Sequence, residues 1–385
     1  KAEGKALVEA LAGLRGEKVA ASLMATANKA KPVARPFLTD VFRRREQTAA
    51  GALVLSWTRD GSVPGRDGWR ALADIAGPEL LAPLTAELAG KPEDRKRIGK
   101  ALLAAAKRVD DPKAGQPLAK RFAAAEDAAE REILVQALGA MGDRQTLRKA
   151  LSDADLDVRL AAARSLGQCG ELADVTPLLT LADTPDARQN VLALRSALQL
   201  LTARADPATG ADVGASLATA WRSARRDEER QHVIATAARY RQAGLLPLLG
   251  GDGVPAGLRP EADAAYVNVA ETAWPDAPEQ VADTLKRIVA ATKDKKLQAR
   301  ARTILDRLAA FQPFLAKLAG NPWQPAFNGR NLTGWRPVGG KKDSWTVDDG
   351  LLVANAKGGG WLARADEMSD YLFELEFRLP PGGNS

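Results

Sequence analysis

The chain has 385 residues, 45% of them hydrophobic and 27% charged, with one Cys and one His. This length provides for two or three domains with a sizeable core, and the composition excludes a disordered or collagen-like chain. Cys169 is the only cysteine and His232 the only histidine. The sequence therefore excludes an internal disulfide and a metal site built from clustered cysteines or histidines. No apolar run reaches the roughly 20 residues of a membrane span, and no phosphate loop or dinucleotide motif occurs. No membrane span, metal or cofactor is therefore expected.

The net charge of +7 does not indicate a nucleic-acid-binding protein. Acidic and basic side chains are interleaved, as in Glu228-Glu229-Arg230, and the longest basic run, Arg43-Arg44-Arg45, is followed at once by Glu46. Nucleic-acid binding needs a one-sided basic stripe, preferably with interleaved aromatic residues. The charges are therefore interpreted as solvated helix surfaces, and no nucleic-acid partner is expected.

Residues 1–318 are rich in Ala, Leu and Arg, which favours helix. Their apolar residues form helical stripes at Ile98/Ala101/Leu102/Ala105, Leu134/Leu138, Val158/Ala162/Leu166, Val191/Leu194/Leu198/Leu201 and Leu297/Ala301/Leu305/Leu308. If Leu102, Leu138, Leu166 and Leu198 are equivalent, the repeat spacings are 36, 28 and 32 residues. Shorter helices are expected between them, for example at 175–182 and 245–249. A helix pair every ~30–40 residues, each burying one face against its neighbours, predicts an α-solenoid.

Segment 155–167 is the clearest copy of this repeat. Asp155 or Asp157 is placed to cap the start of its helix, and Gly167 followed by Gly170 is expected to end it. The run Asp157-Val-Arg-x-x-Ala-Ala-x-x-Leu-Gly167 resembles the second helix of a HEAT repeat. The resemblance implies a scaffold whose concave surface binds a protein partner, which the sequence does not identify.

A change in composition separates this helical part from the rest of the chain. Helix is expected to stop within 313–326, which contains three prolines, because proline removes an N–H donor and restricts the residue before it. The last 67 residues hold four of the eight Trp and eleven of the 33 Gly. The predicted organisation is a solenoid at 1–318, a proline-rich linker at 319–326 and a β domain at 327–385.

The apolar pattern of the β domain alternates with a period of two, which predicts strands. Ser344–Val347 and Leu351–Ala354 are expected to form a hairpin around Asp348-Asp349-Gly350. Residues 371–379 alternate most clearly. The face expected to pack on a core holds Tyr371, Phe373, Leu375, Phe377 and Leu379, and the opposite face holds Leu372, Glu374, Glu376 and Arg378.

Four motifs occur in order in this domain: Phe327-Asn-Gly-Arg-Asn-Leu-Thr-Gly-Trp335, Trp345-Thr-Val-Asp-Asp-Gly-Leu-Leu-Val353, Gly360-Trp-Leu362 and Leu375-Glu-Phe-Arg-Leu-Pro-Pro-Gly-Gly-Asn-Ser385. The series resembles the start of the bacterial 3-keto-disaccharide hydrolase family, over residues 325–385. That family is similar to concanavalin-like jelly rolls, whose two antiparallel sheets present a concave face to sugar. The resemblance implies a mainly α chain that ends in the truncated start of an antiparallel β jelly-roll sandwich.

The resemblance also implies a hydrolase or lyase that acts on glycosides already oxidised at C3 of the sugar. A ketone at C3 acidifies the hydrogen on C2, so that a general base can remove it. The glycosidic oxygen on C1 is then β to the carbanion and can leave, and water adds to the unsaturated product. This route needs a base and a group that polarises the ketone oxygen, but not the paired carboxylates of ordinary glycosidases.

Five residues match the family at positions where a sugar site is implied. Glu376, in the Glu-Phe-Arg motif, is the candidate catalytic base. Arg378 beside it is a candidate for hydrogen bonds to sugar hydroxyls or for steering the Glu376 carboxylate. Asn384 and Ser385 form the candidate rim of the pocket, and Trp361 is a candidate for stacking on a sugar face.

Three functions fit this sequence: an enzyme on 3-keto-glycosides that carries a helical scaffold, a non-catalytic carbohydrate-binding module, and a HEAT-type interaction scaffold. The chain opens at Lys1 in helical pattern and stops at Ser385 within a strand and loop pattern. It is therefore interpreted as a fragment, inactive by itself. The parent enzyme is expected to be exported to the periplasm or surface of a bacterium.

Overall fold

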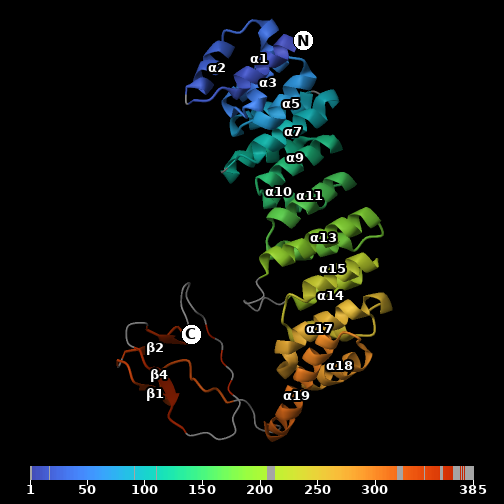
Figure 1. Cartoon of the computed structure of the whole chain (residues 1–385), viewed down its shortest axis with the longest axis vertical. Helices are drawn as coiled ribbons and strands as arrows, with labels where there is room; N and C mark the ends of the chain where they lie inside the picture. The colour runs from blue at the N-terminus through green and yellow to red at the C-terminus, as the bar shows by residue number, and fades with distance from the viewer. Residues whose placement is uncertain are drawn as a thin grey trace. The chain divides into compact units, whose positions relative to one another are not determined.

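The computed structural model describes residues 2–16, 18–90, 92–109, 111–205, 213–318, 324–341, 343–355, 359–366, 373, 375 and 377. The chain forms two compact units, residues 1–301 and 302–385. Helices build the first unit, and all described strands lie in the second (Figure 1). None of the described helices combines the length and the apolar character that crossing a membrane requires.

The helices of the first unit form two layers, and Figure 1 shows their stacking in chain order. The first layer contains α1 Ala2–Gly13, α3 Arg35–Arg44, α5 Gly65–Ile75, α7 Arg95–Ala106, α9 Ala128–Ala140, α11 Leu156–Cys169, α13 Ala187–Arg204, α15 Asp227–Ala237 and α17 Arg259–Ala273. The second contains α4 Gly51–Arg59, α6 Leu81–Gly90, α8 Gln116–Ala124, α10 Arg144–Ala150, α12 Val175–Ala182, α14 Gly214–Ser223 and α16 Leu246–Gly250. The remaining helices are α2 Val19–Ala27, α18 Pro278–Ala291 and α19 Lys295–Leu318. This stack of helix pairs is an α-solenoid, which confirms the predicted fold class.

The core of the solenoid follows the apolar stripes of the sequence. The four leucines taken as equivalent are fully buried and lie on successive first-layer helices α7, α9, α11 and α13: Leu102, Leu138, Leu166 and Leu198. The short helices expected at 175–182 and 245–249, between the longer striped helices, correspond to α12 and α16 of the second layer. Helical period alone therefore predicted which residues join neighbouring repeats.

In two pairs of neighbouring first-layer helices, a glycine of one helix packs against a serine of the next. A Cβ atom at Gly139 would lie 2.3 Å from Ser165 Oγ, and one at Gly167 would lie 2.9 Å from Ser196 Cβ. Each glycine follows the buried leucine of its stripe, so Leu-Gly marks the same contact in both repeats. The expectation that Gly167 helps to end its helix is wrong, because Gly167 lies inside α11 and only Gly170 caps it. Close packing, rather than a turn, accounts for glycine here.

Replacing Gly139 by alanine is expected to lower the free energy of unfolding by about 1–2 kcal/mol, although alanine favours helix, because the added methyl group overlaps Ser165. Urea unfolding followed by circular dichroism measures the change. The double variant Gly139→Ala/Ser165→Gly should regain part of the loss, since it removes the overlapping side chain. A double variant less stable than both single variants would contradict this origin.

The second unit contains the predicted hairpin. Strands β2 Trp345–Asp348 and β3 Leu351–Ala354 pair antiparallel, and the two residues between them, Asp349 and Gly350, have φ values of 45° and 77°. Two successive residues with positive φ form the turn that matches the right-handed twist of a hairpin. Strand β1 Trp335–Val338 pairs antiparallel with β4 Trp361–Arg364. The described strands therefore form two separate two-stranded sheets.

The prediction of a half-buried strand at 371–379 is wrong for the part that the structure describes. Phe373, Leu375 and Phe377 lie outside any strand and are 46%, 58% and 73% exposed. The other residues of this segment lie outside the described residues. Burial of an apolar strand face requires a second sheet packed against it. Phe373 contacts the Trp335 ring of β1, with the ring centres 6.4 Å apart, but all three side chains remain exposed.

Helix α19 includes Pro313 and ends at Leu318, inside the segment where the prolines predict the end of helix. Residues 319–323 lie outside the described residues. The two compact units divide at residues 301 and 302, within α19. The domain limits at 318 and 326 therefore stay a prediction.

Candidate functional site

The structure places one of the five candidate sugar-site residues. Trp361 opens β4 opposite Val338 of β1, directly after Gly359 and Gly360, which both have positive φ. Its side chain is 67% exposed, so the indole ring offers the apolar face that stacking on a sugar ring requires. Glu376, Arg378, Asn384 and Ser385 lie outside the described residues.

A contact group that sequence reasoning missed holds β1 beside β4. The carbonyl oxygen of Ala326 accepts hydrogen bonds from Trp335 Nε1 and from Arg364 Nη1, both at 2.8 Å. The Arg364 guanidinium also lies 5.7 Å from the centre of the Trp335 ring, as a cation–π contact, and pairs with Asp366. The sequence identified Trp335 only as part of a motif. It did not predict the contact with Arg364, which lies 29 residues further along the chain.

The turn before β1 is built from asparagine side chains. Asn328 Oδ1 accepts from the backbone N–H groups of Arg330 and Asn331, at 2.9 and 3.0 Å, and Asn331 Oδ1 accepts from the N–H of Thr333 at 3.0 Å. Such side-chain acceptors stabilise a turn locally. The contacts of motif residues 327–335 therefore stabilise the turn that leads into β1, which is a structural role.

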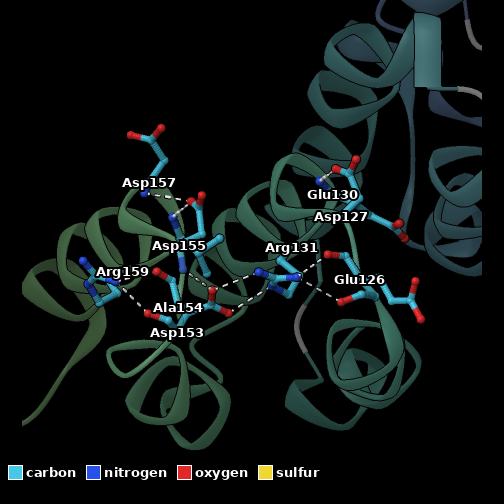
Figure 2. A network of polar contacts seen from close by, with 11 residues as sticks. Glu126, Asp127, Glu130, Arg131, Asp153, Ala154, Asp155, Asp157 and Arg159 are labelled. Atoms are coloured by element: carbon cyan, nitrogen blue, oxygen red, sulfur yellow. Dashed lines mark hydrogen bonds and ion pairs between the residues drawn. The ribbon is translucent and has the colours of Figure 1, made fainter.

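A second functional surface is the solenoid itself, where polar contacts join successive repeats (Figure 2). Arg131 of α9 donates to both carboxylate oxygens of Asp153, each at 3.0 Å, and to the carbonyls of Ala125 and Glu126 at 3.2 and 2.7 Å. Asp153 lies in the turn before the next first-layer helix. One guanidinium thus ties the start of its own helix to the following repeat.

The same device recurs in the following repeats. Asp127, Asp155 and Asp186 cap α9, α11 and α13 by accepting backbone N–H groups. Four residues after each cap stands a side chain that donates to carbonyls of the preceding turn or helix end: Arg131, Arg159 and Asn190. The sequence offered Asp155 or Asp157 as the cap of α11, and the structure assigns this role to Asp155, whereas the role of Arg159 was not predicted. The constant spacing of four residues between the capping aspartate and the donor was the sequence signal for this carbonyl-binding role.

The Arg131–Asp153 pair is expected to couple the two repeats by about 1–2 kcal/mol, because a charge-assisted bidentate pair is stronger than neutral hydrogen bonds. A double-mutant cycle with Arg131→Gln and Asp153→Asn, read by urea unfolding, measures this coupling. The double variant should be only slightly less stable than either single variant. Strictly additive losses would contradict a direct pair.

Comparisons with known proteins identify two parts of the chain. Residues 322–385 match the model of the 3-keto-alpha-glucoside-1,2-lyase-like domain, and residues 115–206 match the model of HEAT repeats, which confirms both resemblances. A search of curated proteins finds no significant match. Among solved structures, the crystal structure of an engineered protein is 14% identical, with a TM-score of 0.41, and the alignment covers 80% of this chain and 94% of that one.

Proposed function

We propose that residues 322–385 belong to a carbohydrate-active domain that acts on 3-keto-glycosides, and that the solenoid is its protein-binding scaffold. The observation that carries the proposal is the match of these residues to a 3-keto-alpha-glucoside-1,2-lyase-like domain. The exposed indole of Trp361 supports it, since an aromatic ring on a strand surface suits contact with a sugar face.

In the proposed reaction the C3 ketone of the substrate makes the C2 hydrogen acidic. Glu376 takes this proton, and the electron pair of the C–H bond moves into an enolate on the C3 oxygen. The enolate then collapses to form a C1=C2 double bond while the C1–O bond breaks, and the departing alcohol takes up a proton. A lyase releases this unsaturated ketone. A hydrolase adds water across it, with the hydroxyl on C1 and the hydrogen on C2.

The test uses the protein purified at its natural length, incubated in D2O with 3-keto-trehalose. Cleavage by this route should place deuterium on C2 of the released 3-keto sugar, or release the C1=C2 unsaturated ketone. Cleavage without either product would contradict the elimination. A protein that binds the substrate but leaves it unchanged would favour the carbohydrate-binding module, and one that does not bind it would leave the scaffold function alone.

A further inference from the structure

The N-terminal end of the solenoid carries an apolar groove that the sugar chemistry does not use. Helices α1, α2 and α3 surround a space of about 510 Å³. Its lining comes mainly from apolar side chains, among them Leu7 and Leu11 of α1, Ala25 of α2, and Phe37 and Leu38 of α3. Val8 and Leu38 are buried and join the groove to the hydrophobic core, whereas Leu7 is 55% exposed.

Exposed apolar surface is concentrated around this groove. Five large apolar side chains are exposed among the described residues of the first unit. Leu7 (55%) and Phe37 (44%) line the groove, and Leu14 (47%) and Val33 (76%) lie in the segments that follow α1 and α2. The fifth, Leu172, belongs to a later repeat. Exposed apolar side chains that gather in one region of a soluble protein mark interaction sites, whereas single exposed residues do not.

The walls of the groove are held in place before any partner binds. Arg45, just after α3, donates to the carbonyls of Ala12 and Leu14 at the end of α1, at 3.0 and 2.7 Å. The ring of Phe37 lies so close to α1 that a Cβ atom on Gly4 would be 2.6 Å from it. A preformed groove binds a helix at a lower cost in conformational entropy than one that must be ordered on binding.

The groove lies in a basic part of the chain. Residues 1–45 contain ten Lys and Arg but only four Asp and Glu. Four of the arginines are engaged within the chain: Arg35 with Asp60, Arg43 and Arg44 with Asp40, and Arg45 with backbone carbonyls. Lys29 lines the groove and Lys31 follows it, and both are exposed, without a carboxylate partner among the described residues.

From this combination we propose that the groove between α1, α2 and α3 binds an acidic amphipathic helix of a partner protein. Leu7 and Leu11, one turn apart, and the exposed ring of Phe37 provide the ridge and wall against which an apolar helix face packs. We infer that this helix is acidic because the ammonium groups of Lys29 and Lys31 lack a carboxylate partner among the described residues. The proposal refines the scaffold part of the proposed function and does not depend on the sugar reaction.

The test measures binding of two labelled synthetic helices to the full chain by fluorescence anisotropy. Both carry Leu at i, i+3, i+4 and i+7, but one has Glu and the other Lys at the remaining positions. The acidic helix should bind more tightly by about tenfold or more, with an advantage that falls as salt is added. Lys29→Glu/Lys31→Glu should make the basic helix bind more tightly than the acidic one. Leu7→Asp should lower the affinity for both helices by about tenfold.

Matched variants separate the groove from the surface in general. Leu172→Asp places the same charge on the exposed leucine of a later repeat, and Lys293→Glu/Lys295→Glu reverses two exposed lysines at the same spacing. Neither should change binding of the acidic helix. No binding of either helix at about 1 mM, or equal losses in these controls, would overturn the proposal. Binding of vesicles with anionic lipid, lost in Leu7→Asp, in the absence of helix binding would instead assign the groove to a membrane surface.

The lysine variant keeps the experiment informative if Leu7→Asp does not fold, because it changes only exposed side chains. The keto-sugar assay should be unaffected by all of these substitutions. Loss of helix binding with normal sugar turnover would therefore report on the groove alone, and loss of turnover with normal helix binding would report on the proposed enzyme alone.

Discussion

Replacing Asp174 by alanine is expected to lower the free energy of unfolding of the chain by about 3 kcal/mol. Asp174 is fully buried at the start of α12 and accepts hydrogen bonds from Arg148 Nε and Nη2, at 2.5 and 3.1 Å, and from the N–H of Glu171 at 2.9 Å. Alanine removes both carboxylate oxygens and therefore all three hydrogen bonds. It therefore loses both the link from α10 to α12 and the cap of the turn before α12. Urea unfolding followed by circular dichroism measures the loss.

The pH dependence of stability gives an independent check on Asp174. Burial by itself raises the pKa of this carboxyl group, but the hydrogen bonds from Arg148 and from the Glu171 amide outweigh it and leave the pKa below its usual range. A carboxyl group with a lowered pKa in the folded state stabilises the fold above its unfolded pKa, and this stabilisation is lost as pH falls towards the folded value. The natural chain should therefore lose stability below about pH 5, and Asp174→Ala should lose less over the same range.

Asp183 provides the matched control for this substitution. It is an exposed aspartate at the other end of the same helix, where it forms the C-cap of α12. Asp183→Ala should change the free energy of unfolding by no more than about 0.5 kcal/mol, as is usual for an exposed site. Similar losses at the two positions would contradict the view that burial and the Arg148 contacts make Asp174 important.

Replacing Glu376 by glutamine is expected to lower turnover of a 3-keto-glycoside by about a thousandfold, because an amide cannot take the C2 proton. Binding of the substrate should change little, since glutamine keeps the shape of glutamate and its ability to hydrogen bond. Turnover by the protein of natural length and binding by calorimetry give the two quantities separately. A carbohydrate-binding module would show no turnover to lose, and only its affinity would change.

Glu374→Gln is the matched control, because Glu374 lies two residues earlier in the chain and is outside the family's Glu-Phe-Arg motif. It removes the same charge from the same segment. It should leave turnover within a few-fold of the natural value, as expected for a group that takes no part in proton transfer. Equal losses in Glu374→Gln and Glu376→Gln would point to the charge of the segment instead of a specific base.

Local pattern was enough to predict several elements of this protein. The stripes through Leu138 and Leu166 predicted helices and their buried faces, because helical period reflects the face that packs on a neighbour. Asp155 predicted the start of α11, and Asp349-Gly350 predicted the turn of the hairpin, because caps and tight turns depend on residues adjacent in the chain. The motif series in 327–385 predicted which known domain this part of the chain matches.

Other features of the protein depend on contacts between residues that are far apart in the chain, and only the structure showed them. Gly167 could be read as a helix end until the structure placed it against Ser196 of the next helix. The roles of Arg131 and Arg364 depend on Asp153 and Ala326, which lie 22 and 38 residues away. Sequence pattern shows that an arginine is polar, but not which carbonyl or carboxylate it will reach. The roles of all five candidate residues of the sugar site stay sequence predictions, and four of these residues lie outside the described residues.

The sequence by itself determined that this protein contains repeated helix pairs followed by a β-hairpin, because periodicity and turn residues act over a few neighbouring positions. Only the tertiary structure decided how the repeats are joined, through Gly139 on Ser165 and Arg131 on Asp153, and that Leu7 and Phe37 border an open groove. These contacts depend on how closely two helices approach and at which register. That approach is set by the packing of all their side chains together, which no single segment specifies.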